Sequence, residues 1–204
     1  MKFRSNGRKE SLMRKRLING IIFLVLIGCA VQTSQAIQVG IGLNYGLRQV
    51  QDEILKETYG DGYVYVPYLR LIPFRSIGFE IAYEGGYKKN GTVGLYEEDS
   101  TLSVTGLEFS GMLFLPLRPL VAYVKLGLGY YTYKQDIESD YTRLTVDHSK
   151  WTTFISGGIS LRVFDGLYIS AEVKSVPLIV RPYDTEVNLG GLRFLAGIGY
   201  SFDF

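Results

Sequence analysis

The sequence predicts an all-β protein, an eight-stranded antiparallel up-and-down transmembrane β-barrel, and three observations carry this prediction. Eight stretches alternate apolar with small or polar residues, as a strand with two unlike faces does. Their connections are long and short in turn, which gathers the short turns on one rim and the long loops on the other. No helical periodicity is found after residue 36.

The strands are expected where this alternation is found. We place them at residues 37–48, 63–71, 77–88, 101–115, 120–134, 151–164, 167–176 and 188–204. Tight turns, rich in Pro, Gly or charged residues, are predicted at 72–76, 116–119 and 165–166. Polar loops are predicted at 49–62, 89–100, 135–150 and 177–187.

Two irregularities are expected within the strands. Pro67 has no N–H to donate to the ladder, so we predict a bulge or a late strand start there. In the fourth strand, Leu102 and Val104 are out of phase with the apolar residues that follow them. This change of phase predicts a bulge near Gly106.

The segment before the first strand has the composition of a secretory signal peptide. A basic stretch precedes an apolar run over 17–31 and a polar stretch that ends at Ala36. The apolar run is too short for a comfortable membrane-spanning helix. We therefore predict a signal peptide over residues 1–36, cleaved after Ala36, and a barrel domain over residues 37–204.

Two alternatives stay open within this leader. Residues 26–29 (Leu-Ile-Gly-Cys) resemble a lipoprotein box, in which Cys29 would be lipidated and would become the new N-terminus. Met13, which is followed by a basic tripeptide, is an alternative true start, because it gives a leader of ordinary length.

Charge and cysteine content exclude several classes of protein. The leader holds seven Lys or Arg residues and one Glu, and the rest of the chain has 15 basic and 19 acidic residues. The basic isoelectric point therefore belongs to the leader, and no nucleic-acid-binding patch is implied. A single Cys excludes an internal disulfide framework. One His and one Cys cannot build a zinc site, and we expect neither a metal nor a cofactor.

The apolar face of each strand is predicted to contact lipid. The opposite face is chiefly Gly, Ala and Ser, which suit the narrow interior of an eight-stranded barrel. Isolated charges in such a lumen need partners, and the strands supply both signs. The predicted interior ionic network comprises Arg70, Glu80, Glu84, Glu108, Lys125, Arg162, Glu172, Lys174 and Arg193.

Aromatic residues near the strand ends fit the girdles that flank the apolar band of a membrane barrel. The expected girdle residues are Tyr45, Tyr65, Tyr87, Tyr130, Trp151 and Phe204.

The chain resembles the small eight-stranded outer-membrane barrels of Gram-negative bacteria, of the OmpA transmembrane-domain and OmpX type, over about residues 37–204. The resemblance rests on the leader, the alternating strands, the Gly-x-Gly repeats and the final GIGYSFDF. It implies a bacterial outer-membrane location, contact with lipid and lipopolysaccharide, and recognition by the barrel-assembly machinery. The residues that resemble the family's assembly signal are Ile198, Tyr200, Phe202 and Phe204.

Three functions stay open. The first is a barrel whose lumen is plugged by side chains, with a structural or surface-interaction role through its extracellular loops and a possible extracellular ligand. The second is an enzyme that modifies lipid A or lipopolysaccharide, a hydrolase or an acyltransferase. The third is a narrow channel for small or apolar solutes, against which the interior charges argue.

The enzyme hypothesis depends on the only His of the chain. His148 lies between Asp147 and Ser149, which together offer the residue types of a nucleophile and its base. Adjacent residues of a strand point to opposite faces, so these three cannot form a triad by themselves. We therefore expect that the protein is not an enzyme and that it has no nucleic-acid partner.

Overall fold

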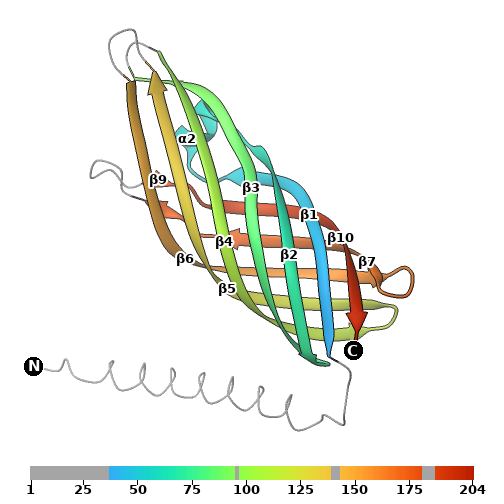
Figure 1. Ribbon diagram of the computed structural model, residues 1–204. Coiled ribbons are helices and arrows are strands. Elements are labelled where there is room, and N and C mark those ends of the chain that lie inside the picture. Colours follow the sequence, from blue (N-terminus) through green and yellow to red (C-terminus); the bar gives the residue numbers. More distant parts are fainter. Residues whose placement is uncertain (1–36, 95–96, 139–142, 181–186) are drawn as a thin grey trace, which may run out of the picture. The chain divides into compact units, whose positions relative to one another are not determined.

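The computed structural model describes residues 37–94, 97–138, 143–180 and 187–204 (Figure 1). The predicted cleavage after Ala36, the alternative lipidation at Cys29 and the alternative start at Met13 lie outside the described residues.

Eight antiparallel strands close into a barrel, so the predicted fold class is confirmed. Around the wall the order is β1 (Gln38–Val50), β10 (Gly191–Asp203), β7 (Leu167–Val176), β6 (Arg143–Arg162), β5 (Leu120–Glu138), β4 (Glu98–Leu117), β3 (Ile77–Val93) and β2 (Gly62–Phe74). Two short strands, β8 (Ile179–Val180) and β9 (Val187–Asn188), form a separate small sheet. Both lie in the connection that leads along the chain from β7 to β10.

The first and last strands seal the wall. Their register runs from the pair Gln38–Asp203 to the pair Val50–Gly191. Beyond the ladder, the N–H of Phe204 donates to the carbonyl of Ile37 at 2.9 Å. Closure leaves no free edge within the part of the wall that these strands form.

A short helix, α2 (Glu53–Thr58), lies in the connection that we expected to be a loop throughout. The carboxylate of Asp52 accepts hydrogen bonds from the N–H groups of Ile54 and Leu55 at 3.1 and 3.2 Å, which caps the helix N-terminus. None of the helices in the described residues is long and apolar enough to cross a membrane.

Two hairpins run much further than predicted. Strands β5 and β6 stay paired up to Glu138 and Arg143, and β3 and β4 up to Val93 and Glu98. The predicted loops at 89–100 and 135–150 are therefore wrong over most of their length. Both faces of these segments are largely polar, so the alternation that identifies a strand is missing there.

The predicted bulge near Gly106 lies in the facing strand instead. The register between β3 and β4 shifts between Glu84 and Tyr87 of β3. Gly86 has φ +93°, a conformation that favours glycine. The extra residue inverts the phase of β3, so that Tyr87, expected in the outer girdle, is buried inside the barrel. In β4 the out-of-phase Val104 faces the interior without a bulge.

Pro67 causes neither a bulge nor a late strand start. It lies within β2, where it pairs with Leu43 of β1 in unbroken register. Its side chain is exposed on the outer face. The register with β3 is the same at Tyr65 and at Tyr68, on either side of the proline.

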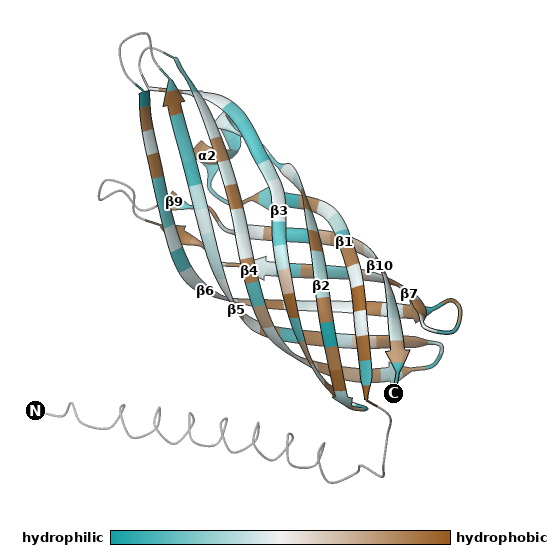
Figure 2. Cartoon of the chain, in the orientation of Figure 1, coloured by the Kyte–Doolittle hydropathy of each residue, from teal (hydrophilic) through white to brown (hydrophobic). Residues whose placement is uncertain are grey.

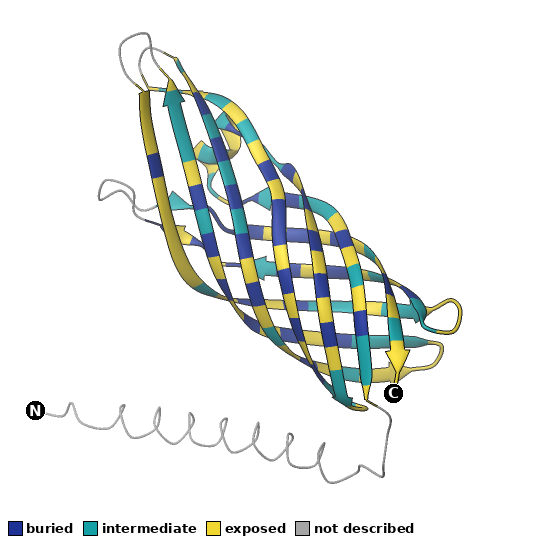
Figure 3. Cartoon of the chain, viewed as in Figure 1, coloured by how far each residue is buried: buried dark blue, intermediate teal, exposed yellow. Residues whose placement is uncertain are grey.

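The outer wall is apolar over the lower part of the barrel (Figure 2). Figure 3 shows the alternation of buried and exposed residues along each strand. The exposed residues of β5 are apolar up to Tyr130, whose ring lies 5.2 Å from that of Trp151 in β6. Across the barrel, on the outer face of β1 and β2, the rings of Tyr45 and Tyr63 stack with their centres 5.7 Å apart. This distribution is that of a barrel that crosses a membrane.

Candidate functional site

The lower part of the lumen holds a chain of alternating charges. Arg70 contacts Glu80 at 2.7 Å, and Lys125 bridges Glu80 and Glu172 at 2.6 and 2.7 Å. The hydroxyl of Tyr123 donates to Glu172 at 3.0 Å. Each of these side chains comes from the inner face of its strand, so four strands are tied together across the lumen.

A second cluster lies nearer the long hairpins and is centred on Glu84. This carboxylate contacts Lys174 at 2.7 Å, Arg193 at 3.1 Å and Arg48 at 3.9 Å. Lys174 also contacts Glu108 at 2.7 Å. Lys174 lies two residues beyond Glu172 of the lower chain on the inner face of β7, so the two clusters are neighbours.

Aromatic rings fill the space beside the charges. The ring of Tyr131 covers the backbone of Gly106 and Gly129, where an added Cβ would lie 2.5 and 2.4 Å from it. The hydroxyl of Tyr131 donates to Glu108. The interior glycines are therefore needed because they make room for tyrosines, which in turn satisfy the carboxylates.

One member of this network was missed and one was wrongly included. Arg48 lies on the inner face of β1, with its guanidinium carbon 4.3 Å from the ring centre of Tyr87. The strand phase placed Arg48 inside, and this signal was sufficient to find it. Arg162 ends β6 at the rim, is exposed, and lies 3.5 Å from Ser201 rather than beside a carboxylate. The prediction of Arg162 as a network member is wrong because the lumen opens to solvent at that level.

The interior of the wall thus contains five cations and four carboxylates, each at most 6% exposed. The buried charged residues are Arg48, Arg70, Glu80, Glu84, Glu108, Lys125, Glu172, Lys174 and Arg193. Removal of any one leaves a partner charged and shielded from water, so the network constrains the strands strongly.

The candidate catalytic residues do not converge. The hydroxyl of Ser149 lies 3.0 Å from that of Thr132 on the outer face of the hairpin. The ring of His148 lies on the inner face, 5.9 Å from the ring of Tyr133. No cluster of three metal-binding side chains is present in residues 37–204, apart from the segments that are not described.

The hairpins project as a four-stranded sheet, formed by β3, β4, β5 and β6 above Tyr130 and Trp151. We call this part the projecting sheet. Its outer face is polar: Thr101 donates to Asn90 at 3.0 Å, and Thr145 donates to Asp136 at 2.7 Å. Hydrogen bonds from Thr145 and from a neighbouring lysine lower the pKa of Asp136.

The projecting sheet ends at one edge of β6. Strand β7 pairs with β6 only between Ile155 and Arg162. Above that point, Thr152 donates to the carbonyl of Pro177 at 2.6 Å, and Lys150 donates to a carbonyl of β8. Among the residues that the structure describes, no strand pairs with residues 143–149 on this side. We call this segment the free edge.

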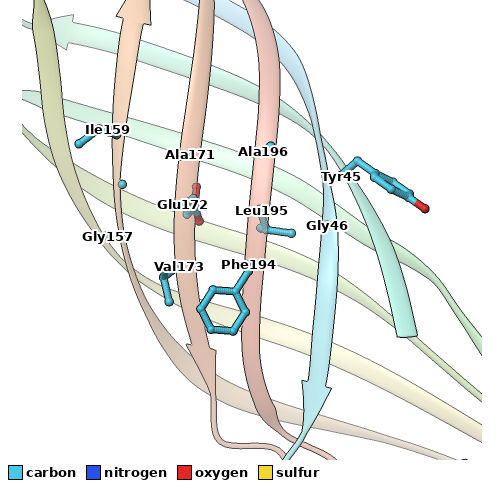
Figure 4. A pocket seen from close by; sticks show the side chains of 11 residues that line it. Tyr45, Gly46, Gly157, Ile159, Ala171, Glu172, Val173, Phe194, Leu195 and Ala196 are labelled. Atoms are coloured by element: carbon cyan, nitrogen blue, oxygen red, sulfur yellow. The ribbon is translucent and has the colours of Figure 1, made fainter. Parts of the chain in front are cut away.

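A shallow groove of about 620 Å³ lies on the lipid-facing wall, across β1, β10, β7 and β6 (Figure 4). Ala171 and Ala196, which are register partners, line it beside the larger side chains of Tyr45, Ile159 and Phe194. It is open and apolar.

Comparison with protein-family models finds no match, and no curated protein matches the sequence. Similar solved structures include the outer membrane protein OprG from Pseudomonas aeruginosa, with a TM-score of 0.62 and 12% identity over 82% of this chain and 96% of that chain. Ail, the attachment invasion locus protein of Yersinia pestis, was solved in complex with the heparin analogue sucrose octasulfate. It gives a TM-score of 0.56 and 14% identity over 82% of this chain and 99% of that chain.

Neisserial surface protein A is also similar, with a TM-score of 0.51 and 12% identity over 84% of this chain and 100% of that chain. At these identities the likeness concerns the fold. The resemblance to small eight-stranded outer-membrane barrels, which the sequence predicted, is confirmed at that level.

Proposed function

We propose that this chain, which has the fold of the small eight-stranded outer-membrane barrels, is a surface-interaction protein with a closed lumen rather than a channel or an enzyme. The observation that carries the proposal is the projecting sheet, which continues past the apolar wall and ends in a free edge at residues 143–149. A barrel that only needed to seal its wall would have no use for these paired residues beyond the membrane.

The length of the projecting sheet supports contact with the exterior. Beyond Tyr130 and Trp151, β5 continues to Glu138 and β6 begins at Arg143. At about 3.3 Å per residue, the eight residues of each strand extend roughly 26 Å along the strand direction. The hairpin therefore rises well above the level of the aromatic girdle.

The free edge has the chemistry of a site for an extended peptide. Each second residue of an unpaired strand turns its N–H and C=O groups outward, which allows a further strand to be added. Along residues 143–149 the outer-face side chains are polar or charged, whereas the inner face carries Leu144 and Val146. The added strand would therefore alternate polar and apolar residues.

The buried charges support a closed lumen. The clusters around Glu80 and Glu84 connect strands from opposite sides of the wall, and Tyr68, Tyr123 and Tyr131 occupy the space beside them. An open water path would hydrate these groups and expose them. We expect conductance near the level of a bare planar bilayer.

The partners in the membrane follow from the outer wall. Acyl chains of outer-membrane lipid and lipopolysaccharide would contact the apolar residues. Three exposed residues on the outer face of β10, Ile198, Tyr200 and Phe202, and the exposed Phe204 that follows the strand would be recognised by the barrel-assembly machinery. Their exposure in the folded barrel is consistent with this role.

Truncation of both long hairpins tests the proposal. Thr132 and Ser149 are register partners, and so are Tyr87 and Val104. One Asn-Gly turn can therefore replace residues 133–148 and a second can replace residues 88–103, which leaves no long unpaired edge on β4. Purified wild-type and truncated proteins are applied to an array of twelve-residue peptides that alternate apolar and polar residues. Folding of both is checked by heat-modifiable migration on a gel.

The wild type should bind a subset of the peptides, and the truncated barrel should bind none of them. Equal binding by the two proteins would overturn the role of the free edge, and an absence of binding by the wild type would exclude an added peptide as its partner. Ion conductance clearly above that of a bare bilayer would overturn the closed lumen.

A further inference from the structure

We propose that the free edge of β6 pairs with the same edge of a second copy of this protein that lies in an opposing membrane. This inference rests on the proposed function, because it names the partner of the same edge. It makes the protein a homophilic contact between two membrane surfaces.

The free edge is complementary to itself. Antiparallel pairing about a two-fold axis at Thr145 places Arg143 opposite Asp147 of the second copy and Leu144 opposite Val146. Residues that face each other across a sheet share a face, and this rule is met for each pair. Arg143 and Asp147 belong to the outer face, whereas Leu144 and Val146 belong to the inner face.

The charges extend a pattern that the hairpin already contains. Within one copy, Arg143 is the register partner of Glu138, and Asp147 is the register partner of Lys134. Pairing of two edges would place Glu138, Arg143, Asp147 and Lys134 in one row, the last two from the second copy. The signs alternate along this row, which is favourable for side chains on neighbouring strands.

The apolar residues of the inner face also gain from the pairing. Leu144 is 43% exposed although it lies on the concave side of the sheet. A second copy would cover it with Val146 and would continue the buried row across the interface. At the centre, two copies of Thr145 would meet, each already hydrogen-bonded to Asp136 of its own hairpin.

The direction of β6 decides where the second copy lies. The strand runs from the tip of the projecting sheet toward the membrane. A copy in the same membrane presents β6 in the same direction, so in-register edge pairing would be parallel and would set Arg143 beside Arg143 and Asp147 beside Asp147. Like charges directly opposite are destabilising. A copy in an opposing membrane presents an antiparallel strand, which gives the complementary register.

The edge-to-edge contact between two copies is short, and a short contact is sufficient when many copies lie on two facing membranes. The edge is available only above Lys150 and Thr152, whose side chains reach Ile179 and Pro177. One such pairing is weak, but many copies on two facing surfaces act together and multiply the effect.

Vesicle aggregation with charge exchange tests the proposal. Full-length wild-type protein is reconstituted into two populations of phosphatidylcholine vesicles free of lipopolysaccharide, one with a donor dye and one with an acceptor dye. Energy transfer between the populations reports contact. Wild-type vesicles should aggregate, whereas Arg143→Asp and Asp147→Arg vesicles should each stay at the level of protein-free vesicles, because like charges then meet.

Mixing the two single variants gives the decisive result. The free edge of Arg143→Asp carries two acidic side chains and that of Asp147→Arg carries two basic ones. The two edges complement each other across the interface, so the mixed populations should aggregate clearly more than either variant alone, although Asp at 143 then lies beside Glu138 of its own hairpin and Arg at 147 beside Lys134. The double variant Arg143→Asp/Asp147→Arg should also aggregate with itself. Thr105→Asp, on the outer face of β4 and paired with Thr132 rather than with a member of the charged row, is the control and should aggregate normally.

A cross-link reports the register. Thr145→Cys should form a disulfide between copies with different tags in separate vesicle populations, because Cβ atoms of directly opposed residues lie close enough for one. The wild type, which has no cysteine between residues 37 and 204, is the control.

Wild-type vesicles that stay apart, or single variants that aggregate no better mixed than alone, would overturn the homophilic pairing. If peptides bind the wild type on the array while vesicles stay apart, the surface-interaction role stands and the second copy is excluded as its partner. If neither occurs, both proposals fail.

Discussion

The membrane-spanning wall and the projecting sheet are parts of the same strands, and their polarity is opposite. In β5, Leu126 faces outward and Lys125 is buried inside, whereas eight residues after Leu126 the exposed residue is Lys134 and its neighbour Tyr133 is buried. The alternation is unbroken between these points. The inversion occurs next to Tyr130, at the level of the aromatic pair with Trp151.

This comparison shows that the period of a pattern and its phase carry different information. The two-residue period gives the strand. The phase of the apolar residues gives the medium on each side, lipid outside the wall and water outside the projecting sheet. Four predictions test the difference between the two regions, from the largest expected effect to the smallest.

Removal of the central carboxylate of the wall should have the largest effect. In Glu84→Gln, three buried cations (Arg48, Lys174 and Arg193) lose their shared partner. Loss of one partner of a buried ionic contact costs about 3–5 kcal/mol. Urea unfolding in phospholipid vesicles measures the loss, and a change below about 1 kcal/mol would show that the cluster does not constrain the fold.

A charge on the outer wall should cost nearly as much. Leu126→Arg places a guanidinium in the middle of the apolar belt, with an expected cost of about 2–4 kcal/mol. Thr132→Arg, on the same strand and face but above Tyr130, should cost about 0–1 kcal/mol. Equal unfolding free energies for the two variants would contradict the membrane boundary at Tyr130.

The bulge of β3 should have an intermediate effect. Gly86→Ala forces a side chain into a conformation with φ +93°, where it would also meet the ring of Tyr65, at an expected cost of about 1–3 kcal/mol. Gly111 is the matched control, because a Cβ added there meets no atom within 4 Å. If Gly111→Ala is as unstable as Gly86→Ala, the positive φ is not the cause.

An ion pair of the projecting sheet should have the smallest effect. Asp136→Asn removes the contact with Lys134 at 3.0 Å on an exposed face, and the urea midpoint at neutral pH should not change measurably. Because the pKa of Asp136 is lowered in the folded state, its small contribution is present above the unfolded pKa and is lost as the pH falls. Comparison of wild type and variant at about pH 3 and pH 6 checks this sign. A large loss at neutral pH would mean that the projecting sheet depends on buried charge as the wall does.

The wall could be predicted from the sequence because each strand there has one apolar and one small or polar face. This contrast placed Arg70, Glu80 and Glu84 on the inner side. It failed at Tyr87, because one extra residue at a bulge exchanges the two faces, and the Gly85-Gly86 dipeptide is the sequence feature that accompanies this bulge. It also failed at Arg162, because phase alone does not tell the lumen from its rim.

The projecting sheet could not be predicted in the same way. Residues 135–150 have polar side chains on both faces over much of their length, so a strand in water there has no more periodicity than a loop. The free edge depends on where β7 ends relative to β6, which is a property of the assembled wall. Helix α2 was missed although Asp52 is a typical N-cap residue, since six residues are too few for a helical pattern.

The seam between β1 and β10 has a consequence for biogenesis. It joins the two strands that are furthest apart in the sequence, along the whole length of both. Until β10 is delivered, β1 and β7 each present bare backbone, and the contact that satisfies them has the highest closure entropy in the molecule. Sealing is therefore a late step, because a fragment without β10 cannot complete the wall. Until β10 pairs with β1, the unfolded chain must be protected from aggregation.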